Sequence, residues 1–361
     1  MRRVTILGAG NGAQTMAGDL ASKGHRVTLY EHPDFEAKIR DLNSRGNRIV
    51  LTNALQAEGQ LAAATTDISL AVRGAEIIFF VAPTFAQAPI FSLALPCFEA
   101  GQTVVIIPGN FGSFALRKML RDRKGPELAL AEADTLPYAC RLVENGRVNV
   151  WGIKNYVGVG TLPGGDFDRV RKTLEDVFPV GIRKHPNALA AGLANANMVV
   201  HCATMVMNAG RIESEKGNFR FYTDGMSPSV CRVQEAVDCE RMAVAKAFGA
   251  DLESTFQGLK ANYDLKGNNL HEVLAGSPVY GSHGPDAPKE MGHRYLSEDV
   301  PYLLVPLSNL GKLAGVPTPV TDSIILLAGV INGADYSGLG WNAAKLGLEA
   351  MSRNEILEFI R

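Results

Sequence analysis

The first half of the chain places its hydrophobic residues in short continuous runs, separated by stretches with helical spacing. Such runs, rich in Val, Ile and Leu, are typical of strands buried on both faces of a parallel sheet. Alternating strands and helices predict an α/β fold with a doubly wound parallel sheet, whose ligand lies beyond the carboxyl ends of the strands. The strands are expected at residues 4–7, 26–30, 75–83, 103–107, 127–132, 148–153 and 156–160, followed by a helix at 166–178.

The alternation stops near His185 and Pro186, after which helical patterns dominate. We therefore expect a first domain over residues 1–185 and a second, mainly α-helical domain over 186–361. The helices of the second domain are expected at residues 188–209, where Gly210 would end the first, at 228–249 behind the N-cap Ser227, and at 354–360 behind the capping box of Ser352 and Glu355.

The strand at residues 4–7 leads into a glycine-rich turn and then into a helix. This context makes the pattern G-x-G-x-x-A indicative of a dinucleotide site of the Rossmann type. The first glycine permits the tight turn, the second lets the backbone approach a pyrophosphate, and the alanine allows helix and strand to pack closely. A glycine-rich turn in some other α/β protein is the alternative. The expected cofactor-binding residues of this turn are Gly8, Gly10, Asn11, Gly12 and Ala13.

A carboxylate follows the second strand, about twenty residues beyond the glycines. Glu31 there would accept hydrogen bonds from the adenosine ribose and would repel a 2′-phosphate. The sequence therefore favours NAD as the cofactor. NADP stays open, because an imidazolium at the neighbouring His32 could tolerate the phosphate.

Two later loops follow buried strands at the same edge of the predicted sheet. They are expected to approach the cofactor, although plain strand-to-helix turns would have the same pattern. The residues assigned to the cofactor from these loops are Ala82, Pro83, Thr84, Pro108 and Asn110.

Composition narrows the class of protein. The chain has 361 residues, 46% of them hydrophobic, and 36 basic residues balance 37 acidic ones, so nucleic acid is an unexpected partner. The five cysteines form no C-x-x-C pair, so reduced core thiols are expected, with a reactive thiol as the alternative, and no metal site. No run resembles a signal peptide or a membrane span, which predicts a cytoplasmic protein with no membrane partner.

The expected helix at residues 188–209 is apolar nearly all round, except for one polar stripe. Asn197, His201, Thr204 and Asn208 are spaced by four, three and four residues, which places them on one helix face. Buried polar groups need partners, so the stripe borders a ligand, water or a neighbouring helix. Imidazole titrates near neutrality, which suits His201 to move a proton during carbonyl or imine reduction.

The segment at residues 293–301 combines charges, an aromatic ring and a proline, and we expect it to be a loop. Several carboxylates of the chain could fix the tautomer of His201, and this segment holds the best candidates. Arg294 there suits a substrate carboxylate, because its guanidinium can bind both oxygens. A surface ion pair between Arg294 and Glu298 is the alternative.

Nearly the whole chain resembles the opine dehydrogenase family, of the octopine and nopaline dehydrogenase type. The segments that carry the resemblance lie at residues 8–13, 132–141, 197–210 and 294–301. The resemblance implies that His201 is the catalytic acid–base, that Asp299 is its partner, and that Arg294 lies near the bound carboxylates. It also implies that the segment from Tyr280 to Lys289 borders the substrate cleft.

The activity implied by this resemblance is reductive condensation of an amino acid with a 2-oxo acid through an imine, and the reverse oxidation, with NAD(P)H as the reductant. Asn197, Thr204 and Asn208 are the further candidates for substrate binding. Two alternatives stay open. One is a ketopantoate-reductase-like or glycerol-3-phosphate-dehydrogenase-like enzyme, which typically depends on a lysine that the helix at 188–209 lacks; the other is an NAD(H)-binding sensor without turnover. The apolar helical half suggests a homodimer.

Overall fold

The structure is a computed structural model that describes residues 1–263, 265–277, 281 and 286–361. It divides into two compact units. The N-terminal unit comprises Met1–Gly192 together with Phe359–Arg361, and the C-terminal unit comprises Leu193–Glu358. The sequence-based boundary at residues 185 and 186 falls earlier, because α7 (Ala188–Leu193) packs in the N-terminal unit: a Cβ on Gly192 would lie 2.7 Å from the ring of Phe111.

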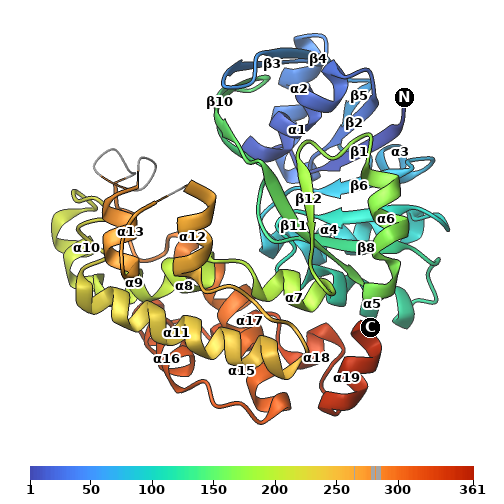
Figure 1. The fold of residues 1–361 in the computed structure, drawn as a ribbon. Helices are drawn as coiled ribbons and strands as arrows, with labels where there is room; N and C mark the ends of the chain where they lie inside the picture. The colour runs from blue at the N-terminus through green and yellow to red at the C-terminus, as the bar shows by residue number, and fades with distance from the viewer. Residues whose placement is uncertain (264, 278–280, 282–285) are drawn as a thin grey trace. The chain divides into compact units, whose positions relative to one another are not determined.

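The main sheet of the N-terminal unit has eight strands, in the order β12-β11-β8-β7-β6-β1-β2-β5 (Figure 1). Six of them are parallel, which places their carboxyl ends at one edge; β11 pairs with β8 in the antiparallel sense, and β12 follows the direction of β11. The strands of this sheet are β1 Arg3–Leu7, β2 Arg26–Tyr30, β5 Ala63–Thr65, β6 Ile77–Phe80, β7 Thr103–Ile106, β8 Ala129–Ala133, β11 Tyr156–Leu162 and β12 Gly181–Lys184.

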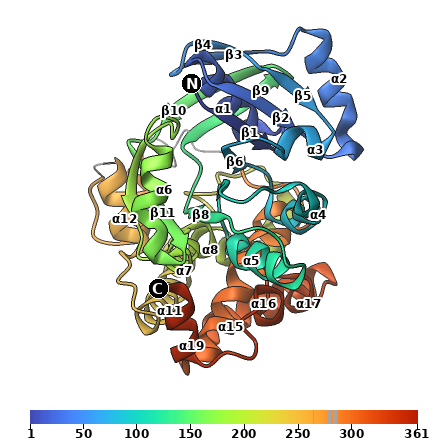
Figure 2. The same cartoon turned by 90° about the vertical axis from the view of Figure 1, so that its right-hand side faces the viewer.

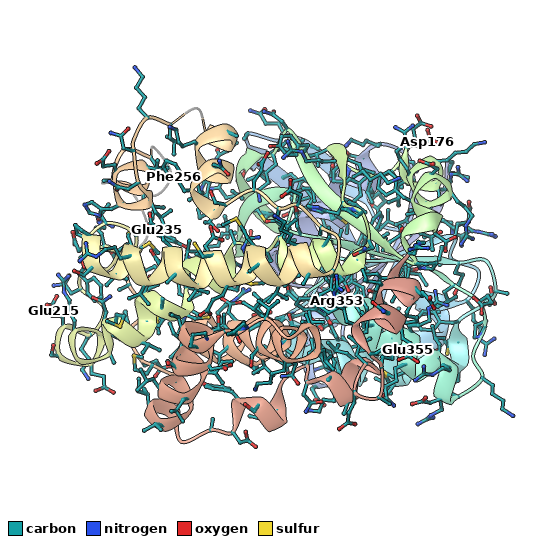
Figure 3. All side chains as sticks on the ribbon, turned by 60° about the horizontal axis from the view of Figure 1, so that its bottom comes forward. Asp176, Glu215, Glu235, Phe256, Arg353 and Glu355 are labelled. Atoms are coloured by element: carbon teal, nitrogen blue, oxygen red, sulfur yellow. The ribbon has the colours of Figure 1, made fainter. Side chains whose placement is uncertain are left out.

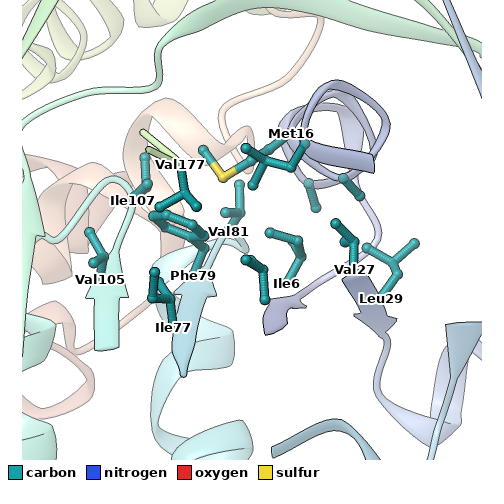
Figure 4. Packing of buried hydrophobic residues seen from close by; sticks show 14 of the residues in the cluster. Ile6, Met16, Val27, Leu29, Ile77, Phe79, Val81, Val105, Ile107 and Val177 are labelled. Atoms are coloured by element: carbon teal, nitrogen blue, oxygen red, sulfur yellow. The ribbon is translucent and has the colours of Figure 1, made fainter. Parts of the chain in front are cut away.

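Helices cover both faces of the main sheet. Met16 of α1 packs with Ile6, Phe79 and Val105 of adjacent strands on one face (Figure 4). On the other face the ring centroid of Phe80 lies 5.1 Å from that of Phe91 in α4. Figure 2 shows α4 and α5 on the side of the sheet away from α6. The longer helices of this unit are α1 Asn11–Ser22, α2 Glu36–Ser44, α3 Ile68–Val72, α4 Gln87–Ala94, α5 Gly112–Asp122, α6 Phe167–Leu174 and α7 Ala188–Leu193.

A second, four-stranded sheet packs against α1, in the order β4-β3-β10-β9. Small residues permit this contact, since a Cβ on Gly18 would lie 2.8 Å from Ile49 of β3. The sequence did not predict this sheet, and it assigned residues 148–153 to the main sheet, whereas β10 belongs to the small one. Its strands are β3 Arg48–Asn53, β4 Ala57–Gln60, β9 Tyr138–Glu144 and β10 Arg147–Ile153.

The C-terminal unit is helical in the part that the structure describes, apart from one isolated bridge between Arg220 and Asp286. Its helices are α8 Asn197–Val200, α9 Cys202–Met207, α10 Ala209–Glu215, α11 Pro228–Ala247, α12 Thr255–Tyr263, α13 Leu270–Ala275, α14 Arg294–Ser297, the π-helix η5 Val300–Leu304, α15 Val305–Ala314, α16 Pro319–Asn332, α17 Tyr336–Leu339, α18 Ala343–Leu346 and α19 Arg353–Ile360.

The long helix predicted at residues 188–209 is not continuous. Turns at residues 194–196 and at His201 divide it into α7, α8 and α9, and Gly210 lies inside α10, which continues to Glu215. The segment Ala188–Met207 nevertheless has the length and hydropathy of a membrane-spanning helix, which corrects the sequence-based statement that no apolar run does. Of that window 83% is buried in the protein, as in the core helix of a globular unit.

The predicted capping box at the start of α19 is present. The backbone amide of Ser352 donates to Glu355 Oε2 at 2.7 Å, and the amide of Glu355 donates to Ser352 Oγ at 3.3 Å. Arg353 and Glu355 mark this helix start in Figure 3. The helix leads the chain back to the N-terminal unit, where Phe359 lies 6.1 Å from Phe114.

Candidate active site

The glycine turn after β1 has the geometry that a dinucleotide needs. Gly8 has a φ of 112°, and a Cβ there would collide with the carbonyl oxygen of Val81. Gly10 has open space where a side chain would be, and as N-cap of α1 it leaves the first-turn amides without a side-chain cap. Ala13 is fully buried. The turn therefore fits a pyrophosphate that approaches backbone and helix start.

Glu31 lies at the end of β2, beside this turn. Its carboxylate accepts hydrogen bonds from the backbone amides of Ala9 at 3.2 Å and His32 at 3.0 Å, and Lys38 Nζ lies 3.4 Å from Oε2. The negative charge is thus fixed where the adenosine ribose of a dinucleotide would lie. Lys38 is the nearby cation, which the sequence analysis did not single out.

Replacing Glu31 with alanine should narrow the preference for NADH over NADPH about tenfold or more. The variant removes the charge that repels a 2′-phosphate and leaves Lys38 free to bind it. The ratio of kcat/KM for the two cofactors at fixed substrates measures the effect. Glu36→Ala, which removes an exposed carboxylate paired with Arg40, is the control and should leave the ratio unchanged. A wild-type preference for NADPH would contradict this assignment.

The two later loops bond to each other. Asn110 Nδ2 donates to Thr84 Oγ1 at 2.8 Å, and both side chains are buried; Asn110 and Phe111 have left-handed backbones, with φ of 50° and 66°. Ala82, Pro83 and Pro108 are less buried and lie in the same two loops. The structure thus brings the predicted loop residues together at the carboxyl edge of the sheet.

A buried carboxylate that the sequence analysis left unassigned holds the second loop. Glu132, at the end of β8, accepts hydrogen bonds from the amides of Phe111 at 3.0 Å and Ser113 at 2.7 Å, and from Ser113 Oγ at 2.6 Å. Burial raises the pKa of Glu132 to about 7, although these three donors oppose the shift. Its position in a strand that is buried throughout hid this role in the sequence.

The Glu132 carboxyl should make folding less favourable as the pH rises. The pKa of Glu132 moves from 4.5 to about 7 on folding. Its stabilising contribution to the free energy of unfolding is therefore complete below pH 4.5 and is lost as the pH rises through 7. The free energy of unfolding of the wild type, minus that of Glu132→Gln, should fall by about 3 kcal/mol between acidic and mildly alkaline pH. Urea titrations across this range measure it, with exposed Glu127→Gln as control; a constant difference would contradict the shift.

His201 and Asp299 lie together in the C-terminal unit. His201 Nδ1 is 2.7 Å from Asp299 Oδ2, and the two residues are only 6% and 4% exposed. His201 occupies the turn between α8 and α9, whereas Asp299 precedes the π-helix η5. π-Helical turns are frequent at functional sites, because they displace side chains from regular α-helical positions. The segment at 293–301 is helical, because α14 and the start of η5 occupy most of it. The sequence-based prediction of a loop there was wrong.

Two tyrosines complete the surroundings of this imidazole. Tyr222 Oη lies 2.9 Å from His201 Nε2. The ring of Tyr295 stacks on the imidazole, with ring centroids 3.7 Å apart and an interplanar angle of 17°. Burial raises the pKa of Tyr295, while a hydrogen bond with Tyr222 opposes the shift. Sequence reasoning missed Tyr222, which lies in the aromatic segment 219–222 between two helices.

The other residues of the predicted polar stripe bond mainly to protein groups. Thr204 Oγ1 donates to the carbonyl of Val200 at 2.6 Å and accepts from Gln234 Nε2 at 2.8 Å. Asn208 Nδ2 donates to the carbonyls of Thr204 and Gly225. Thr204 and Asn208 thus bond to protein groups, as expected if the stripe borders a neighbouring helix. The side chain of Asn197 is half-buried.

Arg294 pairs with Glu298, as the alternative expected, but its guanidinium stays exposed enough to bind a substrate carboxylate as well. Its Nε lies 3.2 Å from Oε2 of the buried Glu298, and its side chain is 58% exposed. Of the segment from Tyr280 to Lys289, Tyr280 and residues 282–285 lie outside the described residues.

The cysteines are all free, and four of the five are at least partly buried. Burial raises the pKa of Cys140 and Cys202, and that of Cys231 to about 12, so these three remain protonated thiols near neutral pH. Among the described residues, no group of three or more His, Cys, Asp or Glu side chains could hold a metal ion.

Solved structures of two dehydrogenases have a similar fold. The structure matches that of octopine dehydrogenase with NADH and L-arginine at a TM-score of 0.81 and 22% identity, covering 99% of this chain and 98% of that one. Yersinopine dehydrogenase matches at 0.71 with 14% identity, covering 96% and 97%. Residues 3–113 match the family model "NAD-dependent glycerol-3-phosphate dehydrogenase N-terminus". These likenesses show the fold, and the N-terminal unit matches a family model of NAD-dependent enzymes.

Sequence relatives make the assignment specific. Residues 184–332 match the family model "NAD/NADP octopine/nopaline dehydrogenase, alpha-helical domain". Opine dehydrogenase of Arthrobacter sp. (strain 1C) is 33% identical over 96% of this chain and 95% of its own. Protein ocs of Agrobacterium tumefaciens (strain Ach5) is 30% identical, covering 99% and 98%. The chain belongs to the opine dehydrogenase family and is an NAD(P)-dependent oxidoreductase acting on CH–NH donors.

Proposed function

We propose that this enzyme joins an amino acid and a 2-oxo acid through an imine and reduces the imine to a secondary amine, with His201 as the acid–base and Asp299 as its partner. The buried 2.7 Å contact between these two side chains is the observation that carries the proposal. Substrates of this class are supported by the octopine dehydrogenase structures that contain L-arginine or pyruvate with NADH.

His201 manages protons in this reaction. Forming an imine releases water from a carbinolamine, and the leaving hydroxyl must gain a proton that the amine nitrogen gives up. An imidazole serves both transfers, because it accepts and donates a proton near neutral pH. The carboxylate of Asp299 accepts from Nδ1, which fixes the tautomer and stabilises the imidazolium when it forms.

The substrate carboxylates need a cation, and we assign this role to Arg294. Its guanidinium is more than half exposed, and Glu298 contacts it at Nε. A guanidinium can bind two carboxylate oxygens at once through its other nitrogens, which fixes the direction of the substrate. Asn197 remains the candidate of the polar stripe for a further polar contact.

The dinucleotide is assigned to the N-terminal unit. The turn from Gly8 to Ala13 would hold its pyrophosphate, and Glu31 would hold the adenosine ribose. A bound reduced nicotinamide supplies the hydride, which no amino-acid side chain can provide. Asn110 and Thr84, bonded to each other, would border it at the carboxyl edge of the sheet.

A substrate screen that follows NADH absorbance tests the proposal. Oxidation of NADH should require both a 2-oxo acid and an amino acid, because the imine is the group that is reduced. Oxidation with the 2-oxo acid alone would indicate a 2-hydroxy-acid dehydrogenase instead, and binding of NADH without oxidation under any pairing would indicate a sensor.

A further inference from the structure

The reactive nitrogen of His201 is already occupied in the protein. Asp299 holds Nδ1, so only Nε2 remains to exchange a proton with a substrate, and the hydroxyl of Tyr222 lies 2.9 Å from that nitrogen. A carboxylate oxygen can only accept, which leaves the proton of a neutral imidazole on Nδ1. Nε2 therefore accepts the hydrogen bond that Tyr222 donates, and in the hydrogen bond between the two tyrosines the neutral Tyr295 hydroxyl then donates to Tyr222 Oη.

Tyr222 is held in place by its surroundings. The side chain is 7% exposed, and its neighbour Phe221 is fully buried and packs edge-on against it at 5.2 Å. The same segment is tied to the preceding helices by Asn208, whose amide donates to the carbonyl of Gly225 at 2.8 Å. The backbone amide of Arg220 donates to Asp224 Oδ2 at 2.9 Å, which closes the segment on itself.

We infer that the hydroxyl of Tyr222 relays the proton between His201 and the substrate, an inference that rests on the function proposed above. A tyrosine hydroxyl donates one hydrogen bond and accepts others, so it can pass a proton on without changing its own charge. The imidazole then acts through Tyr222 and needs no direct contact with the reacting atoms.

The transfer is balanced at each end. When the amine nitrogen or the attacking water loses a proton, that proton binds to Tyr222 Oη, and the original hydroxyl proton moves to His201 Nε2. The imidazole becomes an imidazolium beside the Asp299 carboxylate, and Tyr222 is again neutral. The reverse sequence protonates the leaving hydroxyl of the carbinolamine and restores the neutral imidazole.

The pH dependence of this relay depends on every titratable group that faces the imidazole. Burial lowers the pKa of His293, with Arg294 and His201 adding to the shift, and burial together with the charge of Asp299 raises the pKa of Cys202. The groups around His201 are Asp299 before η5, Tyr222, Tyr295 and His293 at α14, and Cys202 at the start of α9.

Tyr222→Phe tests the relay, because it keeps the ring and removes the hydroxyl. We expect kcat to fall by about tenfold to a thousandfold with the KM for NADH unchanged. Without the donor to Nε2 the neutral imidazole is less favoured, so the acidic limb of the kcat/KM profile for opine oxidation should move to higher pH. Tyr302→Phe is the matched control, since Tyr302 packs against Trp341 in the same unit and lies in none of these contacts.

The outcomes separate the relay from the proposed function when His201→Asn is measured in the same series. An inactive His201→Asn together with a Tyr222→Phe enzyme that keeps its kcat and pH profile would overturn the relay and leave the function standing. An active His201→Asn would overturn both. A Tyr222→Phe enzyme with lower kcat but an unshifted pH profile would reduce Tyr222 to a packing role, which also contradicts the relay.

Discussion

Replacing His201 with asparagine lowers kcat by about a hundredfold or more and leaves the affinity for NADH nearly unchanged. The imidazole is the group assigned to move the proton, and asparagine keeps a polar side chain of similar reach without a titratable nitrogen. The proposed NADH contacts lie in the N-terminal unit, whereas His201 belongs to the C-terminal unit. Steady-state kinetics with both substrates and NADH binding followed by fluorescence measure the two effects.

A matched histidine in the same unit provides the control. His271 bonds through Nδ1 to the carbonyl of Met226 at 2.8 Å and is in none of the contacts of His201. His271→Asn should change kcat by less than about tenfold. Turnover close to wild type in His201→Asn would remove His201 from the mechanism, even though its contact with Asp299 is present.

Replacing Asp299 with asparagine should also cost about a hundredfold or more in kcat, while the enzyme remains folded. The amide has nearly the same shape, but it carries no charge to stabilise an imidazolium and can present a donor to Nδ1. The variant thus holds the imidazole in the wrong tautomer or leaves it free to turn. Kinetics and the melting temperature of the same preparation separate lost chemistry from lost stability.

Asp238 is the control for removing a buried carboxylate. It is 4% exposed, like Asp299, and it binds Arg241 Nε at 2.7 Å and the amide of Thr255 at 2.7 Å. Asp238→Asn should lower the melting temperature and leave kcat of the folded enzyme largely unchanged. If Asp299→Asn shows the same pattern, Asp299 is a structural residue and its assignment to His201 fails.

The dinucleotide-binding unit was largely predictable, because its determinants are local. The turn at Gly8 and Gly10 depends on the absence of a Cβ, and absent side chains are visible in a sequence. The buried strands of the main sheet are also visible in the sequence as continuous apolar runs, because helices cover both faces of the sheet. The small sheet was missed because β3, β4 and β9 mix polar and apolar residues, and because the pairing of β3 with β10, which joins its two hairpins, spans a long separation in sequence.

The pairing of His201 with Asp299 was predicted from family resemblance, not from spacing, because the two residues are separated by 98 positions. The interruption at residues 194–196 has only a weak local signal: it contains no proline or glycine, and only Asn195, whose Oδ1 accepts from the amide of Asn197 at 3.0 Å, marks the turn. The contact of Tyr222 with His201 could not be predicted from the sequence, because the segment of Tyr222 has no helical or strand periodicity. Only the tertiary structure places its hydroxyl at Nε2. Thr204 and Asn208 likewise each have one polar partner outside their own helical turn, Gln234 and the carbonyl of Gly225, which helical spacing does not show.

Transfer of deuterium from NADH labelled at nicotinamide C4 tests the central claim most directly. With an amino acid and a 2-oxo acid present, mass spectrometry should find one product that contains both substrates less one water, plus one deuterium and one hydrogen. The deuterium should lie on the carbon that bears the new secondary amine. His201→Asn should form little of this product in the same time. Deuterium that appears instead in a 2-hydroxy acid, with the amino acid unchanged, would contradict the account.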